Sequence, residues 1–301
     1  MSKYYASVTV LVAGVLAAAS AAAATTWQRT FNDDFDGTSI NSQTWSTLPR
    51  WGNDPINNEL EIYQPGAVSV SGGYLHLTAS RLATPINFKN VDYNYQSGEI
   101  QTQGTVQGTN TSKPFAQLYG RFEIRSKAPA GKGLWPAFWL CAQDLTWPPE
   151  IDIYELPQTS DTGDLNRSHV GYIMPPAQGS STNQGEGTWV SPAGFNVTDF
   201  HTYAIDWNAG GITWLIDDKA VFSSSAAGIP DKPMYIIVNL ALGGGWTGPP
   251  NGNTVLPAEL TVDYVRAYTA VPEPSMAALA GLSAGVMALR RRSRSGALPP
   301  R

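Results

Sequence analysis

The chain has 301 residues, only 14% of them charged, and its formal net charge is −5 at pH 7. The scarcity of basic residues argues against a nucleic-acid partner, because such a partner requires a concentrated positive surface. A single cysteine, Cys141, excludes an intrachain disulfide, and three histidines without metal-ligand spacing give no indication of a catalytic metal.

Residues 1–24 form a separate segment that begins MSKYY, continues through TVLVAGVLAAAS and ends in consecutive alanines. An early lysine, an apolar stretch and small residues near Ala24 are typical of a secretory signal peptide. A buried N-terminal helix is the alternative, and it is disfavoured because alanine side chains offer little surface for packing. We therefore expect residues 25–270 to form one domain that lies outside the cytoplasm.

The middle of the chain shows no long apolar repeat of helical period. Short runs rich in aromatic and β-branched residues alternate with turn residues, as is typical of strands. The clearest runs are GGYLHLTAS at 72–80, QLYGRFEIRSKA at 117–128, FHTYAIDW and ITWLIDD at 200–218, MYIIVNLAL at 234–242, and ELTVDYVRAY at 259–268. The pattern predicts an all-β fold of two packed antiparallel sheets, a sandwich of the jelly-roll type. The nearly continuous apolar run at 234–242 predicts a strand that is covered on both faces.

The segment EIDIYE at 150–155 contains three carboxylates in six residues. Glu150 and Asp152 are two residues apart and share one face of a strand, whereas strict alternation sends Glu155 to the opposite face. A β-bulge supplies one extra residue and returns the next side chain to the original face. We therefore predict that a bulge at Ile153 and Tyr154 brings all three acids into one cleft.

Three acids on one face repel each other, so stability alone gives no reason to keep them. A calcium loop would favour Gly and Asn between the acids, and a solvated edge strand would favour Lys, so both alternatives are disfavoured. Hydrolysis of a glycosidic bond uses two carboxylates, which retaining enzymes hold ≈ 5–5.5 Å apart. A flat strand separates the two glutamate Cα atoms by ~13 Å, so their side chains must lean inward on a curved sheet. We assign Glu150 as the nucleophile, Glu155 as the acid/base, and Asp152 as the hydrogen-bond partner of Glu150.

A series of motifs together resembles glycoside hydrolase family 16, in the order typical of that family. The motifs are FNDDFDG, NNELEIY, SGEIQTQG, YGRFEIRSKAPAGKGLWPAFWL, EIDIYE, FHTYAIDWNAGGITWLIDDKAVF, IIVNLALGGGWTG and VDYVRAY. The resemblance implies a jelly roll with an open cleft on its concave sheet and retaining endo-hydrolysis, with no cofactor required for catalysis. The segments NELEIY, GLWPAFWL and NLALGGGW are similar to the laminarinase-like branch. They favour an endo-1,3-β-glucanase or a mixed-linkage 1,3-1,4 relative.

The resemblance also suggests residues that bind sugar, because pyranose rings need flat apolar surfaces and polar partners at the rim. The stacking candidates are Trp135, Trp139, Trp147 and Trp246. For any one of these tryptophans, a place in the core is the alternative. The polar candidates are Asn58, Glu61, Arg125, His169 and Asn239. For Arg125, a surface salt bridge is the alternative.

A structural calcium ion on the convex side is a further implication of the resemblance. Asp263, in the last predicted strand, and Gly73, through its carbonyl oxygen, would be its ligands. A solvated aspartate at the edge of a sheet is the alternative for Asp263.

Residues 271–301 combine a Pro-Glu-Pro turn, a short apolar run and a cluster of arginines in VPEPSMAALAGLSAGVMALRRRSR. This tail resembles the PEP-CTERM sorting signal of Gram-negative bacteria. The resemblance implies recognition by an exosortase-type membrane enzyme, cleavage near Pro-Glu-Pro, transient membrane anchoring and export to the cell envelope. An ordinary single-pass transmembrane anchor is the alternative, although its apolar run is shorter than the roughly 20 residues that a full span needs.

The hypothesis that these patterns favour is an exported, monomeric, retaining endo-β-glycosidase whose partner is a polysaccharide. Alternatives are a hydrolase or transglycosylase of another polysaccharide, including agar, carrageenan or the cell's own exopolysaccharide. A non-catalytic glucan-binding module and an envelope scaffold are alternatives of a different class. Non-catalytic relatives typically lose the acid pair, and both Glu150 and Glu155 are present here.

Overall fold

The computed structural model describes residues 25–49, 51–53, 56–103, 114–225 and 228–271. One compact unit spans Trp27–Ala270, and the other, Met1–Thr26 with Val271–Arg301, lies almost wholly outside the described residues. The expected signal peptide and the expected sorting segment therefore lie outside them as well. Within the described ranges, no helix has the length and apolar character that crossing a membrane requires.

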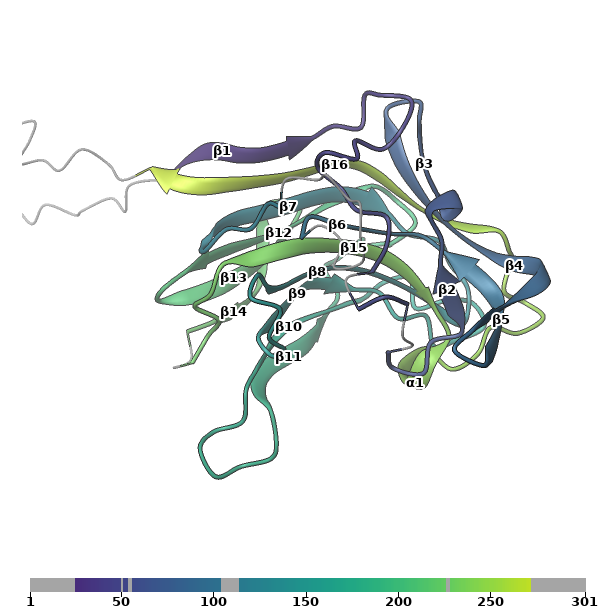
Figure 1. Ribbon diagram of the computed structural model, residues 1–301. Coiled ribbons are helices and arrows are strands. Elements are labelled where there is room, and N and C mark those ends of the chain that lie inside the picture. The colour runs from purple at the N-terminus through teal and green to yellow at the C-terminus, as the bar shows by residue number, and fades with distance from the viewer. Residues whose placement is uncertain (1–24, 50, 54–55, 104–113, 226–227, 272–301) are drawn as a thin grey trace, which may run out of the picture. The chain divides into compact units, whose positions relative to one another are not determined.

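Two stacked β-sheets build the unit Trp27–Ala270 (Figure 1). The first sheet contains β1 (Thr26–Asp33), β2 (Glu61–Tyr63), β3 (Val68–Ser71), β4 (Tyr74–Phe88), β5 (Val91–Ser97), β7 (Gly120–Lys127), β12 (His201–Asn208), β13 (Gly211–Ile216), β14 (Lys219–Ser224) and β16 (Ala258–Val271). Its order is β14-β13-β12-β7-β16-β4-β5-β2, with β1 beside β16 and β3 beside β4. Most of its pairings are antiparallel, whereas β2 and β5 are parallel.

The second sheet has six strands in the order β11-β10-β9-β8-β15-β6. They are β6 (Glu99–Gln101), β8 (Leu134–Ala142), β9 (Glu150–Glu155), β10 (Ser168–Met174), β11 (Gln184–Val190) and β15 (Met234–Leu242). The helical elements among the described residues are a 3-10 turn, η1 (Pro65–Ala67), and a single turn, α1 (Gly244–Thr247). The predicted all-β sandwich of jelly-roll type is confirmed.

The core lies between the two sheets and is built by alternate residues of facing strands. Leu75 and Leu77 of β4 belong to the same buried cluster as Phe138 and Leu140 of β8. Residues two apart on a strand share a face, so one face of each strand supplies this cluster and the other remains available for function.

The strand β15 is buried along all nine of its residues, as its apolar sequence predicts. Val238 lies in the core between the sheets, whereas Tyr235 and Ile237 belong to a second cluster with Cys141. Trp139 packs against this second cluster from its outer side. The prediction of a strand covered on both faces is therefore confirmed.

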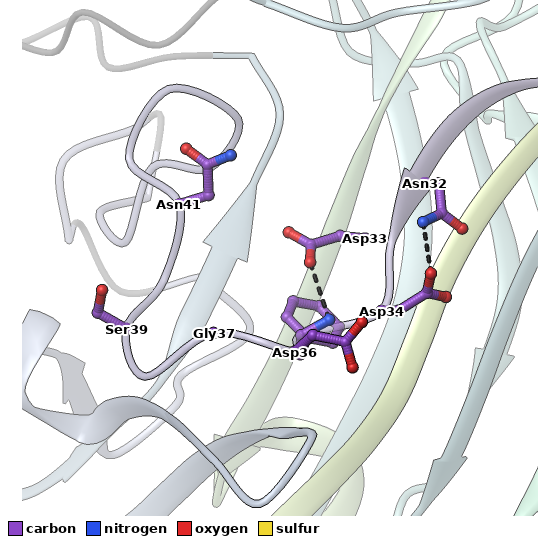
Figure 2. Close-up of a pocket in the computed structure, with 8 residues that line it drawn as sticks. Asn32, Asp33, Asp34, Asp36, Gly37, Ser39 and Asn41 are labelled. Carbon is purple, nitrogen blue, oxygen red and sulfur yellow. Dashed lines mark hydrogen bonds between the residues drawn. The ribbon is translucent and has the colours of Figure 1, made fainter.

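The motif FNDDFDG forms the end of β1 and the turn that follows it. Asp33 accepts a hydrogen bond from the backbone N–H of Phe35 at 2.9 Å. Figure 2 shows Asp33 with its neighbour Asp34 in this turn. The second carboxylate oxygen of Asp33 accepts a hydrogen bond from the Trp45 indole at 2.8 Å, and Asp34 pairs with Arg266 of β16 at 2.7 Å. These acids tie β1 to neighbouring segments, and the small pocket in Figure 2 shares no lining residue with the cleft described below.

Candidate active site

A cleft lies on the face of the six-stranded sheet that points away from the core. In β8, the side chains of Trp135, Trp139 and Cys141 line this cleft, while Phe138 and Leu140 are buried in the core. In β15, Asn239 and Ala241 line the cleft in the same alternating way, and β9, β10 and β11 supply further lining residues. Residues of the segments 51–63 and 244–247 complete the walls.

The strand β9 contains the predicted bulge. Phe138 of β8 pairs with Tyr154, and the next residue, Trp139, pairs with Asp152, so that Ile153 is extra on β9. The pairing of β9 with β10 shows the same shift. Ile153 and Tyr154 are both buried in the core, because the bulge lets two consecutive side chains turn to that side.

Glu150, Asp152 and Glu155 all line the cleft as a result of this bulge. Without the extra residue, Glu155 would point into the core, where an unpaired carboxylate is costly. The structure thus places all three acids on one face of β9, as the sequence predicts.

The carboxylate of Glu150 is held by two neighbours. The indole N–H of Trp147 donates a hydrogen bond to its Oε2 at 2.7 Å, and the Cys141 thiol lies 3.9 Å from the same atom. Burial raises the pKa of Glu150 to about 7, and the charge of Glu155 adds to this, while hydrogen bonds from Trp147 and Asp152 oppose it. The ionised form of Glu150 therefore depends on donors that surround it.

Asp152 is the most buried of the three acids, with 5% of its surface exposed. Burial, followed by the charges of Glu150 and Glu155, raises its pKa well above the usual range for aspartate. The raised pKa favours the protonated form of Asp152, whose carboxyl can donate a hydrogen bond to Glu150. The backbone oxygen of Asp152 accepts a hydrogen bond from the Trp214 indole of the other sheet at 2.8 Å, which fixes β9 in place.

Glu155 has a different environment, in which two aromatic rings each place a nitrogen within hydrogen-bonding distance of its carboxyl group. Trp135 Nε1 donates to Oε1 at 3.2 Å, and His169 Nδ1 lies 3.1 Å from Oε2. The His169 ring is itself packed edge-to-face against Trp246, with 5.0 Å between centroids. A Cβ atom at Gly187 would lie 2.9 Å from the His169 ring, so the lack of a side chain at Gly187 gives the imidazole its space.

Six of the nine candidate sugar-binding residues line the cleft: Trp135, Trp139, Trp147, His169, Asn239 and Trp246. Trp147 and Trp246 are 57% and 36% exposed, as a surface for stacking a sugar ring requires. Trp135 is only 8% exposed, and its indole N–H donates a hydrogen bond to Glu155. Asn239 uses its amide internally. It accepts from Trp139 Nε1 at 2.8 Å and donates to the Tyr63 hydroxyl at 2.9 Å, so it orients Trp139.

The other three candidates, Asn58, Glu61 and Arg125, are absent from the cleft lining. Asn57 and Asn58 both have positive φ, 54° and 59°, and this turn directs Asn57 and Glu59 to the cleft instead. Asn58 is exposed, and Glu61 is buried, where it accepts a hydrogen bond from the backbone of Leu242 at 2.8 Å. The structure therefore places neither of these two residues in the cleft lining, which contains their neighbours Asn57 and Glu59.

Arg125 lies on β7 of the ten-stranded sheet, so its assignment to the cleft was wrong. Its guanidinium forms an ion pair with Asp263 of β16 and packs over the Phe200 ring at 4.6 Å. Arg125 therefore forms the surface salt bridge that was the alternative to a place in the cleft.

This ion pair also bears on the calcium site that the family resemblance implies. The carboxylate of Asp263 already has a cationic partner, and no group of three or more His, Cys, Asp or Glu side chains in the described part of the chain is placed to hold a metal. Gly73 stands in the turn between β3 and β4 with a φ of 81°, where it forms the bend without strain. The residues do not fit a calcium site built on the Asp263 side chain.

Three further acids, which the sequence does not indicate as a group, lie together at the wall of the cleft. Glu59, Glu61 and Glu99 are 9%, 4% and 1% exposed, and Glu59 lines the cleft wall. Among the described residues, Glu61 Oε1 and both carboxylate oxygens of Glu99 have no hydrogen-bond partner. Burial raises the pKa of Glu59 to about 10 and that of Glu61 to about 7, and it raises the pKa of Glu99 well above its usual range.

Similarity to known proteins agrees with this architecture. The family model described as Glycosyl hydrolases family 16 matches residues 67–266. The chain is 33% identical over 258 residues to the endo-1,3-1,4-beta-glycanase EglC of Rhizobium meliloti, a match that covers 80% of this chain and 51% of that protein. It therefore spans about half the length of this relative and of a second one from the same organism, ExsH.

Two other relatives match over nearly their whole length. A glucan endo-1,3-beta-glucosidase of Cryptopygus antarcticus is 30% identical over 274 residues, which are 81% of this chain and 92% of that protein. The crystal structure of an endo-beta-1,3-glucanase from Pyrococcus furiosus superposes with a TM-score of 0.65 at 31% identity, covering 81% of this chain and 95% of that one. The chain belongs to glycosyl hydrolase family 16 and carries a domain of the laminarinase-like kind.

Proposed function

We propose that this protein is a retaining endo-β-glycosidase that cleaves a β-glucan with 1,3 or mixed 1,3-1,4 linkages. The observation that carries the proposal is the bulged strand β9, which directs Glu150 and Glu155 into one aromatic cleft with Asp152 between them. The relatives described above are named as 1,3- and 1,3-1,4-glucanases, which supports the choice of a β-glucan.

The reaction would proceed by double displacement. The Glu150 carboxylate attacks the anomeric carbon from one face while Glu155 donates its proton to the leaving glycosidic oxygen. Glu155, now ionised, removes a proton from water, which attacks the anomeric carbon from the other face and releases Glu150. Asp152 and Trp147 donate hydrogen bonds to Glu150 and so bias its orientation toward the anomeric carbon.

The proposal is tested by the products that the purified protein releases from laminarin, lichenan, agarose and xyloglucan. We expect oligosaccharides of several lengths from laminarin or lichenan, because the cleft is open, and proton NMR should show the β-anomer first. Cleavage of agarose or xyloglucan alone would move the activity to another polysaccharide. Initial release of the α-anomer, or the absence of cleavage on all four, would contradict the proposed mechanism.

We also propose that the protein is exported, that an exosortase-type enzyme processes its tail, and that the mature form is a monomer of the cell envelope. This proposal rests on the sequence patterns of residues 1–24 and 271–301. Intact-mass spectrometry of the protein from a Gram-negative host with an exosortase should show cleavage near Ala24 and near Pro-Glu-Pro. A protein that stays in the cytoplasm and retains both segments would contradict the proposed export. A dimer mass in light scattering would contradict the proposed monomeric state.

A further inference from the structure

The row of side chains that begins at Glu155 continues to the edge of the sheet. Glu155 of β9 pairs with His169 of β10, and His169 pairs with Trp189 of β11, the edge strand of this sheet (Figure 1). Directly paired residues of antiparallel strands project to the same face, so Trp189 lies on the cleft side. The rings of His169 and Trp189 are 5.5 Å apart, in edge-to-face contact.

Trp189 extends the aromatic surface of the cleft. Its strand neighbours Glu186 and Gly187 line the cleft, whereas Trp189 itself lies outside that lining. The ring of Trp246 lies 5.5 Å from that of Trp189, and the two indoles are 36% and 38% exposed. Two adjacent, partly exposed tryptophans at the rim of a cleft are a surface on which a pyranose ring can stack.

Arg167 holds the indole of Trp189 in place. Its guanidinium packs over the Trp189 ring at 4.1 Å from the centroid and pairs with Asp164 at 2.9 Å. The cation–π contact restrains the indole before any ligand arrives, which reduces the entropy lost on binding. The ion pair neutralises the guanidinium, so the surface suits an uncharged sugar.

We propose that Trp189, supported by Arg167, is an additional pyranose-binding subsite that takes a neutral sugar unit of a long polysaccharide beyond the Glu155–His169 side of the cleft. This inference rests on the proposed function, since the ligand is the same polymer chain. The subsite is specific for length: a short oligosaccharide that fills only the positions around Glu150 and Glu155 does not reach it.

The test compares Trp189→Ala with the wild type on β-glucan polymer and on a series of 1,3-linked oligosaccharides of increasing length. We expect kcat/KM on the polymer and the longest oligosaccharides to fall about 3- to 10-fold, the range of an aromatic contact. On the shortest oligosaccharide that is cleaved, the two proteins should be equal. Trp189→Phe, which keeps a ring, should retain most of the activity on the polymer.

Trp27→Ala is the matched control, because Trp27 is a partly exposed tryptophan on β1 of the other sheet. It should leave all of these values unchanged, and melting temperatures of the variants should show that they fold. An equal loss on every length, or no loss on the polymer, would overturn the inference.

Polymer binding by the catalytically disabled Glu150→Gln variant, with and without Trp189→Ala, separates this inference from the proposed function. If the wild type binds β-glucan without cleaving it, the catalytic proposal fails, and weaker binding of the double variant still supports the subsite. Unchanged binding of the double variant overturns the subsite, whatever the wild type does to the polymer.

Discussion

Replacing Glu150 with glutamine is expected to abolish hydrolysis of the polysaccharide while leaving the melting temperature close to that of the wild type or above it. Glutamine has the shape of glutamate but cannot form the covalent glycosyl intermediate. The protein does not depend on a charge at this position for stability, because burial already disfavours the ionised form of Glu150. Initial rates on laminarin and lichenan, with a melting curve of the same sample, check both parts of the expectation.

Glu155→Gln should behave differently from Glu150→Gln. Loss of the proton donor should lower kcat on the polysaccharide by about 10²- to 10⁴-fold. An aryl glycoside with a good leaving group needs no protonation in the first step, so formation of the intermediate from it should be largely retained. A burst of released phenol, followed by slow turnover, is the expected kinetic pattern.

Azide distinguishes the two roles by stereochemistry. With alanine in place of Glu150, azide should attack the activated substrate directly and give the α-glycosyl azide. With alanine in place of Glu155, azide should attack the glycosyl intermediate and give the β-glycosyl azide, because two inversions have then occurred. The reverse result would exchange the roles of the two residues, and near-normal activity of Glu150→Gln would remove Glu150 from the mechanism.

The melting temperature is expected to fall as the pH rises from 5 to 8. Five carboxyl groups in and beside the cleft, those of Glu59, Glu61, Glu99, Glu150 and Asp152, have pKa values that burial raises above their usual range. Between the pKa of the unfolded chain, about 4, and these raised values, the folded protein binds more protons than the unfolded chain. Stability is therefore lost as the pH rises through this window.

The size of the effect follows from the shift in pKa. A carboxyl group whose pKa is raised from 4.5 to about 7, such as that of Glu61, contributes on the order of 3 kcal/mol to the free energy of unfolding. This contribution is lost between pH 5 and 8. For a domain of this size, that amount lowers the melting temperature by about 10 °C. The carboxyl groups of Asp34, Asp144 and Asp164 have lowered pKa values. They change the stability only below about pH 4, so they do not affect the dependence of the melting temperature on pH between 5 and 8.

Glu99→Gln tests the origin of this pH dependence. The neutral amide cannot ionise, so the slope of melting temperature against pH should become shallower than in the wild type. Asp199→Asn is the control, because Asp199 is exposed and its replacement should leave the slope unchanged. A melting temperature that stays constant or increases from pH 5 to 8 in the wild type would show that these acids are ionised in the folded protein.

The sequence alone determined the main architecture and the position of the three acids. Alternation with a period of two identifies strands and the side that each residue takes, so the all-β sandwich could be predicted from runs such as 74–77 and 234–242. The spacing of Glu150, Asp152 and Glu155 is incompatible with a regular strand that keeps all three on one face, and a single bulge resolves it. Both predictions depend on local geometry, which neighbouring residues decide.

Only the tertiary structure decided which sheet a residue belongs to and which partners it has. Arg125 alternates as a cleft residue would, but β7 lies in the ten-stranded sheet, where Asp263 neutralises it. The amide of Asn239 is occupied by Trp139 and Tyr63, which are 100 and 176 residues away along the chain. Local alternation specifies a face of a strand but not the neighbouring strand, because strand order is set by packing between distant segments.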